Sequence, residues 1–231
     1  MTSVRRRNPE SGYPRGEETR ARIIRTAIAL FGEKGFSGVS TREIASAAGV
    51  PAPSLRYYFE NKEGLYQACL DDIQEIALKA ADPALRHAEK LLADPAATAE
   101  AMIDAYCMIL DSMADFLFDT PDSSSRALFI TQQKHPSETE RPTPDKSLGR
   151  RIRSCCTEIV ARTGAGDLSA EEVRVRSTTI NGQLLLVHLA RQHLPEIIGW
   201  DEVTSDRLQT LKKIIRTQTT FILNAYRLQE R

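Results

Sequence analysis

The residues with the clearest chemistry are hydrogen-bond donors and small apolar side chains between positions 42 and 62. An arginine can form two hydrogen bonds to a guanine edge or a phosphate, and lysine, serine and tyrosine donate to phosphate oxygens. Proline and alanine side chains can touch a thymine methyl group. Presented together, these side chains could bind double-stranded DNA: Arg42, Ala52, Pro53, Ser54, Arg56, Tyr57, Tyr58 and Lys62.

A first short helix is predicted just before this segment. Ser40 or Thr41 can cap it, and Glu43 stands three residues after Ser40, which is the spacing of a capping box. Gly49 follows the last apolar position and can take the left-handed conformation that ends a helix. The sequence therefore predicts a helix that stops sharply at Gly49.

A second short helix follows directly. Pro51 and Pro53 suit a first helical turn, where a missing N–H costs little. Leu55 and Phe59 are four residues apart and would face inward. In a helix-turn-helix, the N-terminal residues of the second helix contact base edges. For the bare pattern, a surface helical hairpin with no role in DNA binding stays open as the alternative.

The region from about residue 17 to 66 resembles the TetR family of bacterial transcriptional regulators. The matching positions are Ala27, Leu30, Phe31, Gly35, Phe36, Thr41, Ile44, Ala45, Gly49, Val50, Leu55, Tyr58, Phe59, Lys62 and Leu65. The resemblance implies that the eight residues named above occupy the DNA-contact positions. The family often has tyrosine where this chain has Arg56, and a longer polar residue where it has Ala52, so the operator sequence does not follow from the resemblance.

Charge is distributed unevenly along the 231 residues, although the net charge is zero. Residues 1–62 hold eleven Lys/Arg and six Asp/Glu, and the remainder holds twenty and twenty-five. A basic N-terminal part suits phosphate binding. Residues 1–16 are expected to be a flexible basic arm, which could follow a DNA groove or simply be a solvated tail.

The remaining sequence predicts helices throughout and no persistent strand pattern. The expected class is all-α, with about nine helices: a helix-turn-helix DNA-binding domain at 17–64 and a helical ligand-binding and dimerisation domain at 65–231. A helix from near Asn61 to about Ala80 is expected, followed by one from about Asp82 to Leu92. The other helices are expected at about 95–118, 124–134, 145–162, 169–192 and 203–228, with loops at 135–144 and 195–200.

The sequence lacks the motifs of several other kinds of functional site. The four cysteines form no CxxC pair and no zinc-binding pattern, so no metal or cofactor is expected. There is no GxSxG, phosphate-binding loop or HExxH motif, which argues against an enzyme. Without a signal peptide or membrane-length apolar run, the expectation is a cytoplasmic protein that contacts no membrane. Buried thiols are the main expectation, and a redox sensor at Cys155 and Cys156 is the alternative.

The segment from Arg126 through HPSE and on to GWDEV resembles the subgroup typified by the CecR/YbiH regulators. By resemblance to the TetR family, the last two long helices of the chain would form a four-helix bundle with a second copy, and a homodimer would suit a palindromic operator. Polar residues within apolar helices are the candidates for contact with a small-molecule effector, although each could equally be a core or interface residue. They are Tyr106, Gln132, His135, Asn181, Gln183 and His188.

The function expected from these features is that of a homodimeric repressor that a small-molecule ligand releases from its operator. The alternative is a ligand-independent activator or an architectural DNA-binding protein that uses the same helices.

Overall fold

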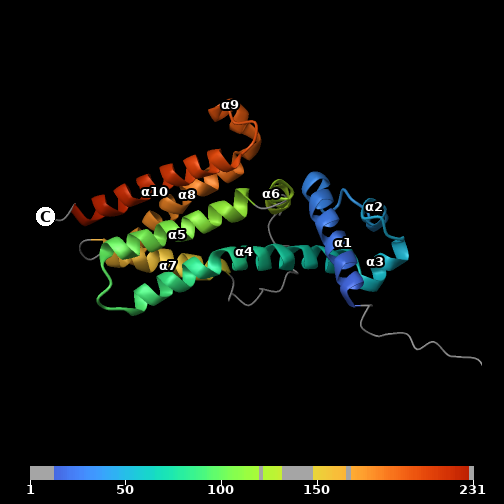
Figure 1. Cartoon of the computed structure of the whole chain (residues 1–231), viewed down its shortest axis with the longest axis horizontal. Helices are drawn as coiled ribbons and strands as arrows, with labels where there is room; N and C mark the ends of the chain where they lie inside the picture. Colours follow the sequence, from blue (N-terminus) through green and yellow to red (C-terminus); the bar gives the residue numbers. More distant parts are fainter. Residues whose placement is uncertain (1–12, 120–121, 132–147, 165–167, 229–231) are drawn as a thin grey trace, which may run out of the picture. The chain divides into compact units, whose positions relative to one another are not determined.

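A computed structural model of the chain describes residues 13–119, 122–131, 148–164 and 168–228. Within these ranges the protein is all-α, with ten α-helices where about nine are expected (Figure 1). They are α1 Tyr13–Lys34, α2 Thr41–Ala47, α3 Ala52–Tyr58, α4 Lys62–Ala93, α5 Ala99–Phe118, α6 Ser123–Thr131, α7 Leu148–Thr163, α8 Ala170–Leu189, α9 Leu194–Ile198 and α10 Ser205–Leu228. A 3₁₀ turn at Arg191–His193 precedes α9.

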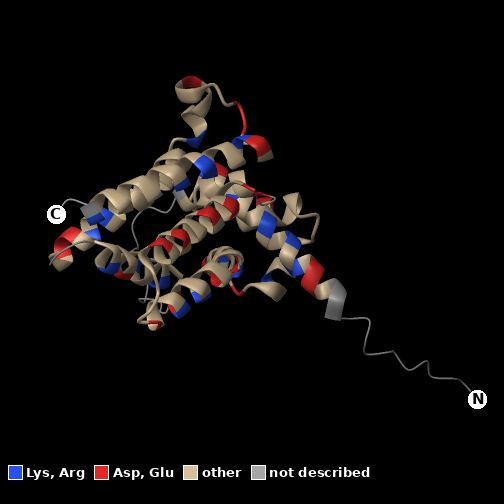
Figure 2. Ribbon diagram, turned by 60° about the vertical axis from the view of Figure 1, so that its left-hand side comes forward, with Lys and Arg blue, Asp and Glu red and all other residues tan. Residues whose placement is uncertain are grey.

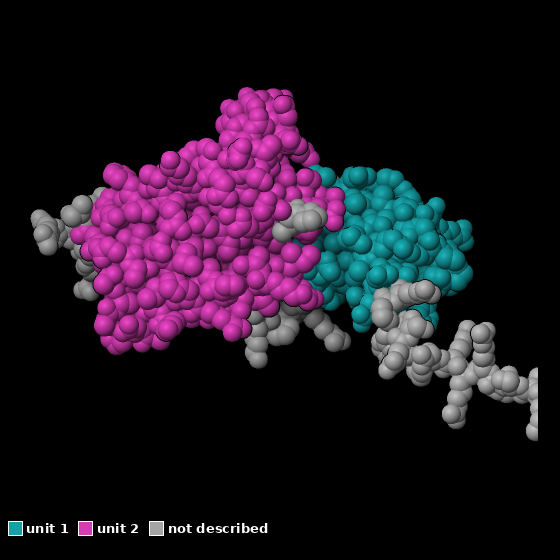
Figure 3. All heavy atoms as spheres, in the orientation of Figure 1, with its two compact units in different colours: residues 1–73, 128–133 teal, residues 74–127, 134–231 magenta. Residues whose placement is uncertain are grey.

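Two compact units divide the chain (Figure 3). Unit 1 contains the described residues of 1–73 and 128–133, and unit 2 contains those of 74–127 and 134–231. Helices α4 and α6 therefore contribute residues to both units. Helix α1 begins before position 17, so positions 13–16 of the expected flexible arm are helical. Pro14 is the second residue of α1, where its missing N–H costs no helical hydrogen bond.

The core of unit 2 is a helical bundle in which α5 packs against α7, α8 and α10 (Figure 1). Tyr106, Ile109, Cys156 and Ile159 are among its fully buried side chains. Ion pairs link α5 to α10: Arg216 pairs with Asp104 and Asp111, and Lys212 pairs with Asp115. Figure 2 colours the basic and acidic positions along the ribbon.

The expectation of two helices, one ending near Ala80 and one beginning at Asp82, is wrong, because α4 is continuous through Pro83. A proline inside a helix removes one hydrogen bond and costs roughly 3 kcal/mol. Pro83 is exposed, so water can solvate the backbone there, while Ala84 and Leu85 are buried. Packing of the apolar face thus outweighs the local preference for a helix end.

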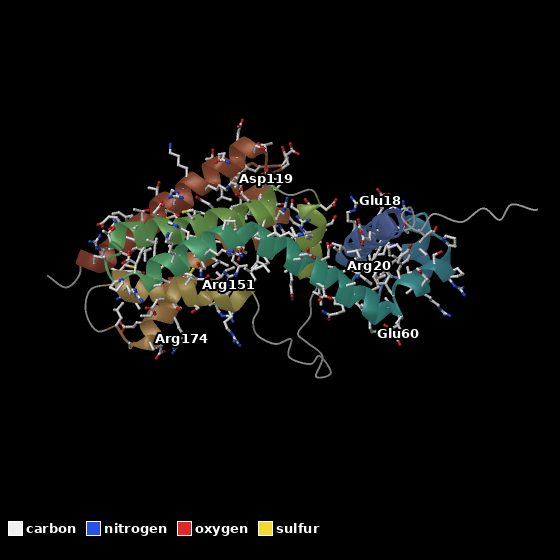
Figure 4. The ribbon with its side chains drawn as sticks, turned by 60° about the horizontal axis from the view of Figure 1, so that its bottom comes forward. Glu18, Arg20, Glu60, Asp119, Arg151 and Arg174 are labelled. Carbon is white, nitrogen blue, oxygen red and sulfur yellow. The ribbon has the colours of Figure 1, made fainter. Side chains whose placement is uncertain are left out.

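Arg151 of α7 spans the same stretch of α4 (Figure 4). Its guanidinium donates to Asp82 at 2.9 Å, and to both carboxylate oxygens of Glu89 at 2.9 and 3.0 Å. These acids lie on either side of Pro83, one residue before it and six after it. The hydrogen bond from Arg151 is the largest cause that lowers the pKa of Asp82 below its ordinary 3.8.

Replacing Arg151 with methionine is expected to lower the thermal stability near pH 7. Because the folded-state pKa of Asp82 is depressed, the stabilisation is present above the ordinary pKa and is lost as pH falls through the folded-state value. The melting temperatures of wild type and Arg151→Met should therefore converge as the pH falls below the ordinary pKa of Asp82, 3.8. Arg162→Met, which removes only an exposed pair with Glu158, is the control. A constant difference down to pH 2.5 would contradict the role given to Arg151.

Candidate nucleic-acid interface

Helix α2 is fixed at its N-terminus as the sequence predicts. Ser40 Oγ accepts from the Glu43 backbone N–H at 3.1 Å, and Glu43 Oε2 accepts from the Ser40 N–H at 3.5 Å. Glu43 also pairs with Lys34, the last residue of α1. This pair lowers the pKa of Glu43 and raises that of Lys34. The capping box is confirmed, and it also links α2 to the end of α1.

The turn after α2 has the left-handed residue that the sequence predicts. Gly49 has φ +65°, and the Val50 N–H donates to the Ala45 carbonyl at 3.0 Å. Arg22 of α1 donates through Nε to the Ala48 carbonyl at 3.0 Å, which satisfies an acceptor at the end of α2. The direction of the chain between α2 and α3 is thus fixed by Gly49 and by a side chain of α1.

Helix α3 is held by two buried side chains on one face. Leu55 and Phe59, which directly follows α3, are both buried, as expected. Arg20 of α1 lies over the Phe59 ring at 5.3 Å from its centroid, and Figure 4 labels this arginine on α1. Pro51 is the N-cap and no side chain caps the helix, so packing rather than capping positions α3.

The eight predicted contact residues all lie in unit 1. Exposed side chains are those of Arg42 on α2 and of Ala52, Pro53, Arg56 and Tyr57 on α3, with Tyr57 84% exposed. Ser54 and Tyr58 are half-buried, and the Tyr57 and Tyr58 rings meet edge to face at 5.2 Å. The opposite face of α3 thus presents one charge, Arg56, with small and aromatic groups.

Lys62 differs from the other predicted contacts. It begins α4, is half-buried, and its Nζ lies 4.5 Å from the centroid of the Phe36 ring. This cation–π contact holds the ammonium group by the aromatic cluster of Phe31, Phe36 and Tyr66. Lys62 therefore has a packing role that the sequence alone did not indicate.

Arg20, Arg22 and Lys34 are the functional supports that sequence reasoning missed. All three are charged residues on the outer face of α1, where the sequence gives no sign that they reach α2 or the segment after α3. Their partners are up to 39 residues away in the sequence, so only the tertiary structure identifies them.

The four described residues among those expected to contact an effector lie in unit 2, and not all at one place. Tyr106 is fully buried, and its Oη lies 3.0 Å from Asn181 Oδ1 and 3.2 Å from the Ser177 carbonyl oxygen. Gln183 donates to the carbonyl of Ile180 at 3.1 Å. His188 is buried at the end of α8. Gln132 and His135 lie outside the described residues.

The four cysteines are all buried and unpaired with one another. Burial raises the pKa of Cys69 and Cys156 to about 12 and also raises that of Cys155 and Cys107. Thiolates are the reactive form, so these thiols are poor nucleophiles. Nothing in the geometry favours the alternative of a redox sensor at Cys155 and Cys156. In the described part of the chain, no cluster of metal-binding side chains and no helix apolar enough to cross a membrane is present.

Replacing Gly49 with alanine is expected to destabilise the protein by about 1–2 kcal/mol, because an L residue is strained in the left-handed conformation. Space is not the cause, since a Cβ at Gly49 would meet no atom within 4 Å. Gly16→Ala in α1, where the new Cβ would lie 4.0 Å from Tyr58 Oη, is the control and should not destabilise. Urea unfolding monitored by circular dichroism measures both variants, and equal stability of Gly49→Ala and wild type would refute the assignment.

Comparison with known proteins assigns both parts of the chain. Residues 23–69 match the family described as bacterial regulatory proteins, tetR family, and residues 102–226 match the HTH-type transcriptional dual regulator CecR, C-terminal domain. The CecR protein of Shigella flexneri is 23% identical over 209 residues, which are 90% of this chain and 93% of that protein.

One further relative matches the DNA-binding part of the chain, and one solved structure matches its fold. The biofilm operon negative transcriptional regulator IcaR of Staphylococcus aureus is 34% identical over 61 residues, 25% of this chain and 33% of that protein. A crystal structure of a TetR-like transcriptional regulator from Rhodococcus sp. RHA1 has the same fold, with a TM-score of 0.55 and 13% identity over 87% of this chain and 93% of that one. The chain therefore belongs to the TetR family of DNA-binding transcriptional regulators, which are not enzymes, and its C-terminal domain is of the CecR type.

Proposed function

We propose that this regulator is a homodimeric repressor that binds a palindromic operator and leaves it when a small molecule binds to unit 2. The observation that carries the DNA-binding part is the outer face of α3, where Ala52, Pro53, Arg56 and Tyr57 are exposed opposite the buried anchors. Arg42 and Arg56 supply the charge on this face. The eight predicted residues remain the proposed DNA contacts. Lys62 is expected to contribute least, because its ammonium group lies over the Phe36 ring.

A strip of exposed apolar side chains supports the dimer. Helix α8 exposes Leu186 at 69% and helix α10 exposes Phe221 at 75%. The same two helices also expose Val175, Leu185, Leu189 and Ile214. Large apolar side chains gathered on neighbouring helices mark an interaction surface. Gly182, four residues before Leu186, would let a partner helix approach closely, since a Cβ there would meet no atom of this chain within 4 Å.

Helix α6 supports coupling between ligand binding and DNA binding. Its Phe129 is buried in unit 1, where the ring centroid lies 4.9 Å from that of Tyr66 and 6.2 Å from that of Phe31. Arg126, three residues earlier, lies over the Phe116 ring within unit 2. A ligand that binds the two conformational states unequally at α6 would shift their populations. A ligand-independent activator or architectural protein is the second candidate, and no observation favours it.

The first experiment is a gel shift of the purified protein with DNA upstream of its own gene, followed by footprinting. A short protected palindrome that overlaps a promoter supports the proposal, whereas broad occupancy of the DNA favours an architectural protein. If no band shifts, selection from genomic fragments supplies the operator. A failure of selected fragments to yield any preferred sequence would sink the proposal.

Arg56→Ala is expected to weaken operator binding by about 1–3 kcal/mol if Arg56 reads a base. The loss should be smaller for a scrambled duplex, because a base contact is specific and a phosphate contact is not. Fluorescence anisotropy at two salt concentrations measures both affinities. Arg174→Ala is the control, since Arg174 is an exposed arginine of α8 in unit 2 (Figure 4). Equal losses on the operator and the scrambled duplex would reassign Arg56 to a phosphate.

The double variant Leu186→Glu, Phe221→Glu is expected to be a folded monomer with operator affinity reduced at least tenfold. Both side chains are mostly exposed in the single chain, so the helical content should be unchanged. Light scattering after size exclusion measures the mass, and circular dichroism checks the fold. Leu78→Glu on α4, another exposed apolar position, should leave the mass of the dimer unchanged. A double variant that stays dimeric would show that the interface lies elsewhere.

A further inference from the structure

The end of α8 forms a small cluster with α5 and α6 within unit 2. The rings of His188 and Phe118 meet edge to face, with centroids 6.2 Å apart. Three residues after His188, the Arg191 guanidinium lies 5.3 Å from the centroid of the same Phe118 ring. Arg126 of α6 lies over the Phe116 ring at 5.6 Å. The cluster thus combines two guanidiniums, an imidazole and two aromatic rings.

In the described part of unit 2, Arg191 lacks a carboxylate partner of the kind that Arg151, Arg216 and Arg227 have. It donates to the Leu117 carbonyl at 3.0 Å and to Ser123 Oγ at 3.2 Å, and both acceptors are neutral. Among the described residues it has no ion pair, whereas Arg151 and Arg216 each pair with two acids. Burial, and then the charge of Arg126, lower the pKa of Arg191. Arg191 is therefore a partly buried positive charge that no described carboxylate neutralises.

His188, a second polar residue of the cluster, lacks hydrogen-bond partners among the described residues. Its side chain is 4% exposed, and neither ring nitrogen has a hydrogen-bond partner within the described part of the protein. A neutral imidazole offers one donor and one acceptor, and buried polar atoms almost always have partners. Burial and the charge of Arg191 lower the pKa of His188, which favours the neutral ring, and neither nitrogen has a described partner.

We propose that His188 and Arg191, with the positive charge of Arg126 beside them, bind the carboxylate of an apolar organic acid. A guanidinium binds a carboxylate through two parallel hydrogen bonds, and the imidazole N–H can supply a third donor. The Phe116 and Phe118 rings suit the apolar part of the ligand. A doubly charged phosphate fits less well, since burying the second charge beside these rings costs more desolvation.

The location of this site suggests a role in regulation. The inference names the chemical class of the effector, and it therefore rests on the proposed function. Arg191 is partly exposed, which lets a carboxylate approach from solvent. Ser123 and Arg126 belong to α6, the helix whose Phe129 is buried among Phe31 and Tyr66. A carboxylate that takes over the hydrogen bond from Arg191 to Ser123 would act directly on α6.

Benzoate and octanoate are the probes, with benzamide and octanamide as neutral matches. At least one acid is expected to bind saturably by calorimetry and raise the melting temperature, and its amide should do neither. The ring nitrogen resonances of His188 should shift in ¹⁵N-histidine spectra on binding. Absence of saturable binding by both acids, or equal binding of acid and amide, would overturn the proposal.

Two variants separate a binding role from a structural one. Arg191→Gln should lower the acid's affinity at least tenfold, but it also loses a contact to the end of α5. His188→Phe keeps a ring against Phe118 and removes two unpaired nitrogens, so it should raise the melting temperature of the free protein and still lower affinity at least tenfold. Arg176→Gln on α8 and His87→Phe on α4 are the controls and should bind as wild type does. Wild-type affinity in His188→Phe would refute the site.

Operator release distinguishes this inference from the proposed function. The acid that binds should lower the operator affinity of wild type by roughly 5- to 150-fold and leave that of His188→Phe unchanged. Binding of the acid at His188 with no effect on the operator would retain the site and reject ligand-controlled release through it. Release by other compounds, with no acid bound, would retain the function and reject the site.

Discussion

A helix of seven residues is too short to be stable in water by itself, and this constraint governs the DNA-binding unit. Both α2 and α3 have this length, so their geometry depends on contacts with other elements. Leu55 and Phe59 anchor one face of α3, while α1 contributes Arg20 to Phe59 and Arg22 to the end of α2. The buried face of α3 and its contacts with α1 therefore set the position of its exposed face.

Some charged side chains of unit 2 have a structural role because they form ion pairs, whereas others have no described ionic partner that would explain their position. The arginines of α7 and α10 that approach α4 and α5 meet carboxylates, which offsets the cost of removing them from water. Arg191 and His188 depart from this pattern, with neutral acceptors for one and no described partner for the other. Departures of this kind concentrate at functional sites, since a well-packed protein otherwise avoids them. That contrast singles out the cluster from the other polar residues of the bundle.

Local chemistry made the DNA-binding region predictable from the sequence. The capping box at Ser40 and the left-handed Gly49 each depend on residues within a few positions, and both are confirmed. A helix end near Ala80 was predicted, and this was wrong because the packing that keeps α4 continuous comes from residues distant in sequence. Likewise, nothing local distinguishes Tyr106, which is hydrogen-bonded in the core, from His188, which lacks a partner. Arg126 and Arg191 are 65 positions apart, so their proximity required the fold.

The burial of all four cysteines has a practical consequence for spectroscopy. Thiols with raised pKa values and no solvent access react slowly with maleimides at neutral pH. A cysteine introduced at an exposed position, such as Arg42 or Arg174, would therefore react far faster than the native ones. Fluorophores or spin labels could then be attached to the otherwise unmodified chain. Distances between labelled positions could be followed in solution without first replacing a core residue.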